Sequence, residues 1–200
     1  MKSARLEAFT DGVIAIIITI MVLNLRVPEG TSFSALRESA PLLIAYVLSY
    51  VNVGLYWNNH HHLLQATTRI DGKVLWANLF LLFWLSLVPF IIRWLGQASF
   101  AAAPMAAYGL VLGMASVGWT LLQRAIIACG GLPKKVAAAI GRDHKLKLTQ
   151  ICYLVAIPAS FLRAEIAIAL YVVAAAIWII PDKRIESALV VPGADEESDR

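Results

Sequence analysis

Long apolar blocks separated by short polar segments dominate this chain of 200 residues. A helix needs about 20 apolar residues to cross a membrane, and six blocks are close to that length. They are residues 6–25, 41–64, 74–95, 101–122, 146–162 and 166–180. The blocks lack the short alternation of membrane β-barrel strands. The pattern predicts an all-α polytopic membrane protein with six transmembrane helices, the last two forming a tight hairpin at Arg163 and Glu165.

Composition narrows the class of protein. Hydrophobic residues make up 60% of the chain and charged residues only 15%, and the mean hydropathy is +0.72. Soluble domains carry about 25% charged residues, so a water-soluble enzyme and a disordered protein are both excluded. The formal net charge of +4 is no sign of nucleic-acid binding, because the basic residues lie between the apolar blocks. Cys129 and Cys152 form no redox motif.

Lysine and arginine placement predicts the orientation in the membrane. If the N-terminus is cytoplasmic, most of the 17 basic residues fall on the inner side, the exceptions being Arg26, Arg37, Arg93 and Arg163. We therefore expect both termini in the cytoplasm and residues 129–147 to form the main cytoplasmic loop. Residues 1–182 are expected to form the transmembrane domain, and residues 183–200 an acidic, disordered cytoplasmic tail.

Asp11 lies about one and a half turns into the first predicted helix. An ionisable group inside a membrane span needs a partner or a cavity. Glu7 shares its face and its sign, and Arg5 is about 240° away around the helix. Donors on other helices are therefore expected to satisfy Asp11, either from residues 57–62 at the end of the second span or from Trp76 and Asn78 at the start of the third. Two interpretations remain open, a structural polar lock between helices and a proton-sensitive switch through histidine.

Three consecutive histidines, His60, His61 and His62, do not predict a metal site. Neighbouring helical residues point about 100° apart, so the three side chains cannot converge on one ion. No cysteine or carboxylate at helical spacing completes a site. His60 shares a face with Trp57 and is the best histidine candidate for the polar lock. His61 and His62 are expected at the membrane interface.

The opposite side of the first helix carries an apolar stripe with one hydroxyl. Ile16, Thr19, Ile20 and Leu23 follow the spacing of a single helical face, and their mean direction is roughly opposite Asp11. If Asp11 faces its own subunit, this stripe faces lipid or a symmetry axis shared with other copies. The Thr19 hydroxyl then lines a pore or bonds its own helix backbone.

Other signals concern packing more than chemistry. Gly109-x-x-x-Gly113, with Gly118 beyond, permits close helix contact. Pro89 and Pro158 are expected to kink their helices. The sequence has no phosphate-binding glycine loop, nucleophile elbow, H-E-x-x-H motif or pair of catalytic carboxylates, so we expect no enzymatic activity and no cofactor.

Three segments in the first half of the chain point to a known family. They are Arg5-Leu-Glu-Ala-Phe9-Thr10-Asp11, Tyr56-Trp57-Asn58-Asn59-His60, and Asn78-Leu-Phe-Leu-Leu followed by Leu87-Val88-Pro89-Phe90. The first resembles the R-x-x-x-F-S-D signature of the lysosomal potassium channel family, transmembrane protein 175, and its bacterial relatives, with Thr10 in place of the usual serine. The other two are similar to the end of that family's second helix and to its third helix.

The resemblance implies a bacterial inner-membrane channel. Bacterial members form tetramers of six-span subunits whose first helices line a central pore, without a T-V-G-Y-G filter. The family's constriction of bulky apolar residues falls here on Ile16, Ile20 and Leu23, with Thr19 adjoining. The permeant ion would be K⁺, with other monovalent cations passing less well, and the partners would be lipid and further copies of the chain. The residues expected to anchor the pore helix in a structural polar network are Arg5, Phe9, Thr10, Asp11, Trp57, His60 and Asn78.

Two other functions stay open at this point. A proton-coupled secondary transporter would need an ionisable group near the membrane midplane, and Asp11 lies nearer the cytoplasmic end. A non-conducting membrane scaffold would show no ion flux.

If the chain is a channel, its apolar constriction predicts a weak to moderate preference for K⁺ over Na⁺, because a dehydrating apolar collar offers no replacement for the ion's water.

Overall fold

The computed structural model describes residues 3–28, 30–140 and 144–179, and this part of the chain is helical, without strands. Its elements are α1 (Ser3–Leu23), η1 (Phe33–Ala35), α2 (Leu36–Gln65), α3 (Gly72–Ser86), α4 (Val88–Gln97), α5 (Ala102–Ala128), α6 (Lys134–Ile140), α7 (His144–Leu162) and α8 (Ala164–Ile179). The all-α prediction is confirmed for these residues.

Five helical stretches within the described residues are long and apolar enough to cross a membrane. They are Ser3–Leu23, Ser39–Gln65, Gly72–Gln97, Ala102–Ala128 and His144–Leu162. The sixth predicted span, residues 166–180, corresponds to α8, which is apolar but has only 16 residues. At 1.5 Å per residue such a helix is about 24 Å long, somewhat short of the hydrocarbon thickness.

The third predicted span is divided into two helices. α3 ends at Ser86 and α4 begins at Val88, with Pro89 in the first turn of α4. Proline lacks the N–H that would continue the helical ladder, and it fits a first turn, so the break lies where Pro89 predicts one. Pro158, in contrast, lies inside α7, which the structure assigns as one helix.

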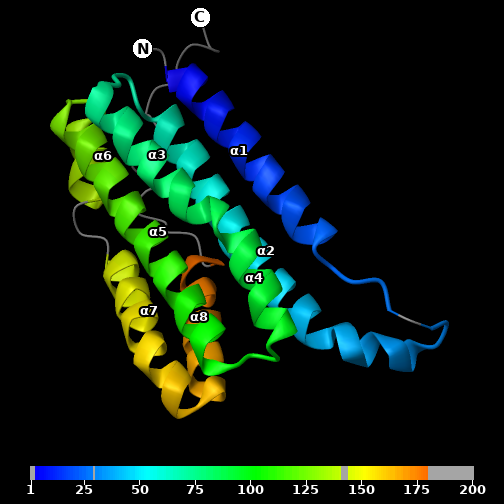
Figure 1. The fold of residues 1–200 in the computed structure, drawn as a ribbon. Helices are drawn as coiled ribbons and strands as arrows, with labels where there is room; N and C mark the ends of the chain where they lie inside the picture. Colours follow the sequence, from blue (N-terminus) through cyan, green and yellow to red (C-terminus); the bar gives the residue numbers. More distant parts are fainter. Residues whose placement is uncertain (1–2, 29, 141–143, 180–200) are drawn as a thin grey trace, which may run out of the picture.

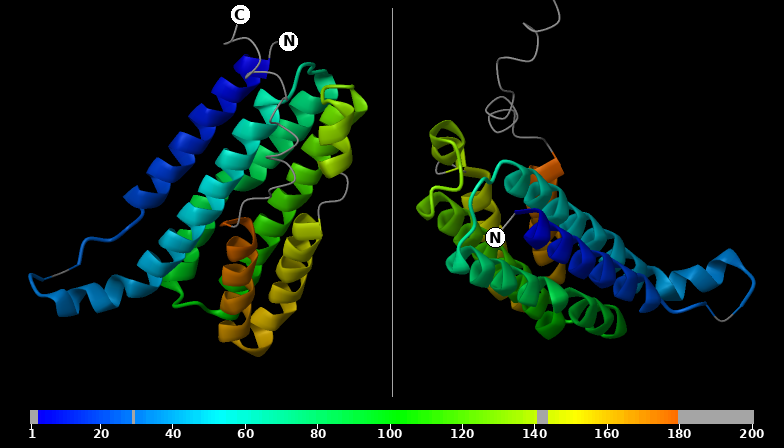
Figure 2. Two further views of the ribbon diagram at one scale, coloured as in Figure 1. Left: turned by 180° about the vertical axis from the view of Figure 1, so that it is seen from behind. Right: turned by 90° about the horizontal axis from the view of Figure 1, so that it is seen from above.

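The helices form an elongated bundle in which α5 is central and α1 lies at one edge (Figures 1 and 2). α5 packs against α3 and α4 on one side and against the α7–α8 hairpin on the other. α1 packs against α2, α3 and α4. The segment between α1 and α2 extends away from the bundle at the C-terminal end of α1 (Figure 1). Among the residues that the structure describes, no other helix covers the remaining side of α1.

The segment predicted as the main cytoplasmic loop, residues 129–147, contains a short helix, α6, at residues 134–140. This local helix is consistent with a run of alanines, which have the highest helix propensity. The acidic tail predicted at 183–200 and the last residues of the predicted transmembrane domain lie outside the described residues.

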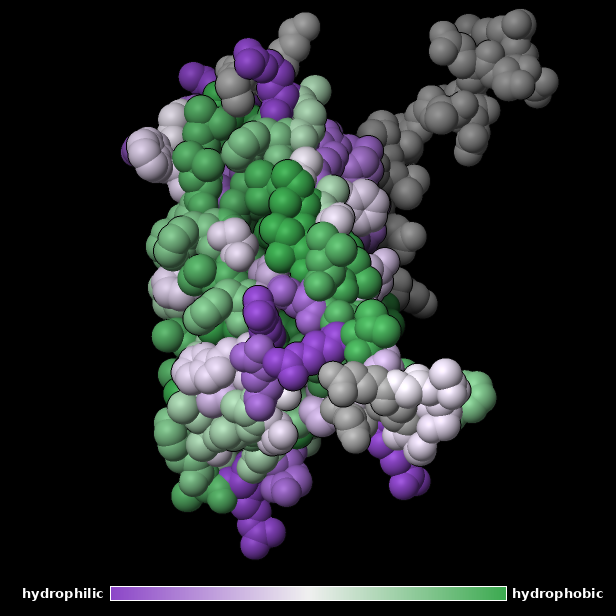
Figure 3. All heavy atoms as spheres, turned by 45° about the vertical axis from the view of Figure 1, so that its right-hand side comes forward, coloured by the Kyte–Doolittle hydropathy of each residue, from purple (hydrophilic) through white to green (hydrophobic). Residues whose placement is uncertain are grey.

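The surface of the bundle suits a lipid environment. Hydrophobic side chains cover much of the face shown in Figure 3, while hydrophilic ones gather toward its ends and near the α1–α2 connection. Large apolar residues on α7 remain exposed, such as Leu154 at 70% and Phe161 at 65%. Contiguous apolar surface of this kind marks a membrane or protein contact.

Glycines allow the closest approaches between helices. A Cβ atom placed on Gly118 would lie 2.9 Å from the Cα of Leu81, so α5 and α3 touch there through backbone. A Cβ on Gly109 would meet the hydroxyl of Tyr171 on α8. Gly113 is less tight, with its nearest neighbour 3.6 Å away. Close packing thus depends on Gly109 and Gly118 more than on Gly113.

Candidate functional site

α1 has one buried side and one exposed side. Its buried residues, spaced three or four apart, are Leu6, Thr10, Ile14, Ile17 and Met21. This spacing places them along one face of a helix, and that face contacts α2, α3 and α4. The rest of the bundle therefore fixes how α1 is rotated about its axis.

The exposed side of α1 contains the residues that the sequence singled out as a constriction. Ile16 is 60% exposed, Ile20 44% and Leu23 76%, and Thr19 is also exposed. We call Ile16, Thr19, Ile20 and Leu23 the constriction stripe. The stripe lies on the outer edge of the single chain, and its apolar side chains require lipid or another copy of the chain as a neighbour.

The Thr19 hydroxyl already has a partner within its own helix. Its Oγ1 atom donates to the carbonyl oxygen of Ala15 over 2.8 Å. The sequence left two roles open for this hydroxyl, lining a pore or bonding its own helix backbone, and the single chain shows the bond to the backbone. The hydroxyl oxygen of Thr19 can still accept hydrogen bonds, because a hydroxyl has two lone pairs.

A buried hydrogen-bonded chain links α1, α3 and α2. The side-chain amide of Asn78 donates to Thr10 Oγ1 over 2.9 Å, and its Oδ1 lies 2.8 Å from His60 Nε2. The relative exposure of all three residues is at or below 1%. Since the Asn78 oxygen can only accept, His60 carries its proton on Nε2 in this arrangement. We call Thr10, Asn78 and His60 the buried trio.

A second set of contacts joins α1 to α2 nearer the surface. Trp57 Nε1 donates to Asp11 Oδ1 over 2.9 Å, and one turn away His61 Nδ1 lies 2.7 Å from Glu7 Oε1. The rings of Trp57 and His61 stack with centroids 6.0 Å apart, and Gln65 Nε2 lies 2.8 Å from His61 Nε2. We call the Asp11–Trp57 and Glu7–His61 contacts the two outer rungs.

The polar residues at the α1–α2 contact have partners that differ in part from the predicted ones. Asp11 is bound from another helix, by one of the donors named for it, but His60 contacts Asn78 and not Asp11. His61, expected simply at the interface, forms a rung with Glu7. A sequence signal for it existed, because Glu7–Asp11 and Trp57–His61 are both four residues apart and so form matching pairs on facing helices.

Arg5 and Phe9 are on the exposed side of α1, outside both sets of contacts. Arg5 is exposed and Phe9 is 51% exposed. At 100° per residue, Phe9 points within about 20° of Ile16. The single chain therefore places Phe9 on the same side as the constriction stripe, not among the anchoring residues.

The histidine run spreads as helical geometry requires. His60 points inward to Asn78, His61 faces Glu7, and His62 is exposed. No group of three or more histidine, cysteine, aspartate or glutamate side chains within residues 3–28, 30–140 and 144–179 could hold a metal ion.

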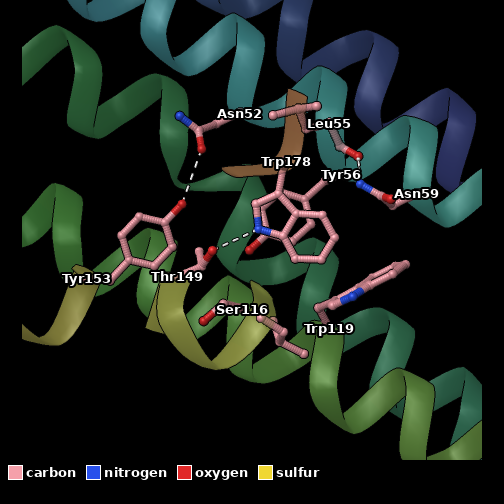
Figure 4. A pocket seen from close by; sticks show the side chains of 10 residues that line it. Asn52, Leu55, Tyr56, Asn59, Ser116, Trp119, Thr149, Tyr153 and Trp178 are labelled. Carbon is pink, nitrogen blue, oxygen red and sulfur yellow. Dashed lines mark hydrogen bonds between the residues drawn. The ribbon is translucent and has the colours of Figure 1, made fainter. Parts of the chain in front are cut away.

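A small cavity lies inside the subunit, between α2, α5, α7 and α8 (Figure 4). Its volume is about 30 Å³, and hydrogen bonds from Tyr153 to Asn52 and from Trp178 to Thr149 cross-link its walls over 3.2 and 2.9 Å. α1 contributes no lining residue. The cavity is therefore separate from the constriction stripe.

Comparison with known proteins identifies the family. The family model described as endosomal/lysosomal potassium channel TMEM175 matches residues 5–89, which contain nearly all of α1, the buried trio and both outer rungs. A Chryseobacterium protein named as a potassium channel is 50% identical over 189 residues, covering 94% of this chain and 98% of that protein. The chain belongs to the TMEM175 family.

Structural comparison agrees with TMEM175 membership. A crystal structure titled as a lysosomal potassium-selective channel TMEM175 homolog from Chamaesiphon minutus has a TM-score of 0.76 and 25% sequence identity, and it covers 88% of this chain and 96% of that one. A bovine relative named endosomal/lysosomal proton channel TMEM175 is 39% identical over 81 residues, which is 34% of this chain and 17% of that protein. The match to the animal protein is thus confined to a much smaller part of the chain.

Proposed function

We propose that this TMEM175-family protein is a potassium-permeable cation channel whose pore is lined by α1 from four copies of the chain. The names of the Chryseobacterium relative and the Chamaesiphon structure support K⁺ as the permeant ion. The observation that carries the pore assignment is the constriction stripe, because an apolar edge of α1 is left open while the opposite edge is fixed by polar contacts.

The proposed constriction acts by dehydration. Ile16 to Leu23 extends about 10 Å along the helix axis. Four copies of each apolar side chain would surround the ion without supplying oxygen ligands, so ions that release water more easily pass better. K⁺ holds its water less tightly than Na⁺, which gives a weak to moderate preference for K⁺. Thr19 oxygens from four copies would form a polar ring inside this collar.

The proposed assembly follows the family resemblance. Each subunit would cross the bacterial inner membrane six times, with α8 as the short sixth span and both termini in the cytoplasm. The placement of basic residues supports this orientation. Residues 1–182 would form the channel domain. The outer rungs and the buried trio would hold α1 at the angle that directs the constriction stripe to the axis.

Proton conduction is the second candidate, because the bovine relative carries the name proton channel. Asp11 and Glu7 are titratable groups on α1, but both face α2 and have partners there. Nothing titratable lies on the constriction stripe itself. K⁺ permeation is therefore the primary proposal, and the proton is tested beside it.

Ion flux from proteoliposomes tests the proposal. Liposomes loaded with K⁺, Na⁺ or Cs⁺ report selectivity, and a pH-sensitive dye inside them reports proton entry. We expect K⁺ flux above Na⁺ flux, and Ile16→Asn should raise the flux and reduce the discrimination. Leu154→Asn, which places the same polar group on exposed α7, is the matched control and should leave both unchanged. Saturable flux that requires a pH gradient would indicate a transporter, and no flux would indicate a scaffold.

A further inference from the structure

We propose that Phe9 forms a second apolar ring in the conduction path, on the cytoplasmic side of the constriction stripe. This inference rests on the proposed function, because it requires α1 to line a pore. It assigns Phe9 a direct part in limiting ion flow, where the sequence resemblance had implied an anchoring part.

The burial pattern around Phe9 carries the inference. Leu6 is 4% exposed and Thr10 0%, so the residues on either side of Phe9 turn into the subunit. Phe9 itself is 51% exposed, close to the 60% of Ile16. The chain therefore folds so that a large aromatic ring stays half exposed on α1 instead of being buried in its own core.

Helix geometry places Phe9 and Ile16 in one line. They are seven residues apart, which is nearly two turns, and their directions differ by about 20°. The axial distance between them is about 10 Å. If the Ile16 side chains of four copies face the axis, the Phe9 side chains face it as well, one narrow section below the other.

Gly12 separates the two rings. It is exposed, and a Cβ atom placed there would meet nothing within 4 Å in the single chain. The exposed side of α1 therefore carries a bulky residue, a gap and a second bulky residue. In a pore this order gives two apolar sections with a wider section between them.

The chemistry of phenylalanine sets the expected effect. Four bulky apolar rings narrow the path and favour dewetting, which raises the barrier to every hydrated cation. The ring faces attract cations only weakly compared with water oxygens. Removing the Phe9 side chains should therefore increase the conductance for K⁺ and for Na⁺ alike. The K⁺/Na⁺ conductance ratio, which the constriction stripe would set, should be largely unchanged.

Conductance of Phe9 variants in planar bilayers tests the inference. Phe9→Ala should raise the K⁺ conductance at least about twofold, and Phe9→Trp should lower it, with little change in the K⁺/Na⁺ ratio. Phe83→Ala is the matched control, because Phe83 is exposed to a similar extent, 56%, but belongs to α3 and not to the helix proposed to line the pore. Wild-type conductance in both Phe9 variants would overturn the inference while leaving the proposed function intact. A wild-type protein that conducts no ions would instead refute the proposed function.

A thiol-labelling experiment covers the case in which Phe9→Ala fails to assemble. Phe9→Cys is made in a background with Cys129→Ser and Cys152→Ala, and a membrane-impermeant cationic thiol reagent is applied from the cytoplasmic side. We expect a decline in K⁺ current as the reagent attaches. Complete labelling, verified by mass spectrometry, with unchanged current would overturn the inference, and so would protection of the cysteine from the reagent by lipid.

Discussion

Trp57 donates its indole N–H to the carboxylate of Asp11, so an acidic residue inside the first span is satisfied by the second helix. The bond lies on the side of α1 opposite to the constriction stripe. It therefore connects the anchoring of α1 with the direction in which Ile16, Ile20 and Leu23 point.

Replacing Asp11 tests this connection. Asp11→Ala removes the acceptor, and we expect lower yield of assembled protein and a reduced melting temperature, because the Trp57 donor loses its partner. Asp11→Asn keeps an acceptor oxygen and should assemble better than Asp11→Ala. Size-exclusion chromatography and thermal melting in detergent measure both. Equal assembly of wild type and Asp11→Ala would contradict a structural role for the bond.

The buried trio should be more sensitive than the outer rungs. Asn78→Ala removes both hydrogen bonds and leaves Thr10 and His60 without a buried partner, which costs about 1–3 kcal/mol for each stranded group. Asn58→Ala, at an exposed position of α2, is the control and should be nearly neutral. Thr10→Ser, which retains the hydroxyl, should be tolerated, while Thr10→Val should not. Melting temperatures in one detergent rank the four variants, and an equal loss in Asn58→Ala and Asn78→Ala would refute the ranking.

The Glu7–His61 rung should contribute little to stability. The two side chains are 20% and 34% exposed respectively, and pairs of this kind contribute less than about 1 kcal/mol. Glu7→Gln should therefore lower the melting temperature less than Asn78→Ala does. A loss in Glu7→Gln as large as the loss in Asn78→Ala would show that this outer rung contributes as much as the buried trio.

Two glycines on α5 offer a test of helix packing. Gly118→Ala places a methyl group 2.9 Å from the Cα of Leu81, so the backbone of α3 would have to move to relieve the contact. In Gly113→Ala the nearest neighbour of the new methyl group is 3.6 Å away, an ordinary van der Waals distance. We expect Gly118→Ala to lower the melting temperature clearly and Gly113→Ala to leave it unchanged or raised, because alanine favours helix. Melting temperatures of both variants in the same detergent test this. A larger loss in Gly113→Ala than in Gly118→Ala would contradict the close α3–α5 contact.

The apolar pattern predicted the helices well because hydrophobic length is a local property of the chain. The first, second, fourth and fifth predicted spans correspond to single helices. The break between α3 and α4 was signalled by Pro89, again a local effect. The helix α6 was missed because it is short and lies in a polar segment that only its alanines distinguish.

The partners of the polar residues were less predictable, because they depend on how three helices rotate against one another. Helical phase correctly placed Ile16 and Thr19 on the exposed side of α1. It could not predict whether His60 would hydrogen-bond to Asn78 or to Asp11, because both residues were expected at a similar depth in the membrane. Phe9 was grouped with its motif neighbours, although its phase already matched that of Ile16 and not that of Asp11.

Thiol modification on the constriction stripe tests the central claim most directly. Ile20→Cys, in the same background with Cys129→Ser and Cys152→Ala, is reconstituted into liposomes and treated with a small hydrophilic thiol reagent while K⁺ flux is followed. Val172→Cys, at an exposed position on α8, is the control. We predict that modification of Ile20→Cys blocks K⁺ flux and that modification of Val172→Cys does not. Full modification of Ile20→Cys with unchanged K⁺ flux would show that α1 does not line the conduction path.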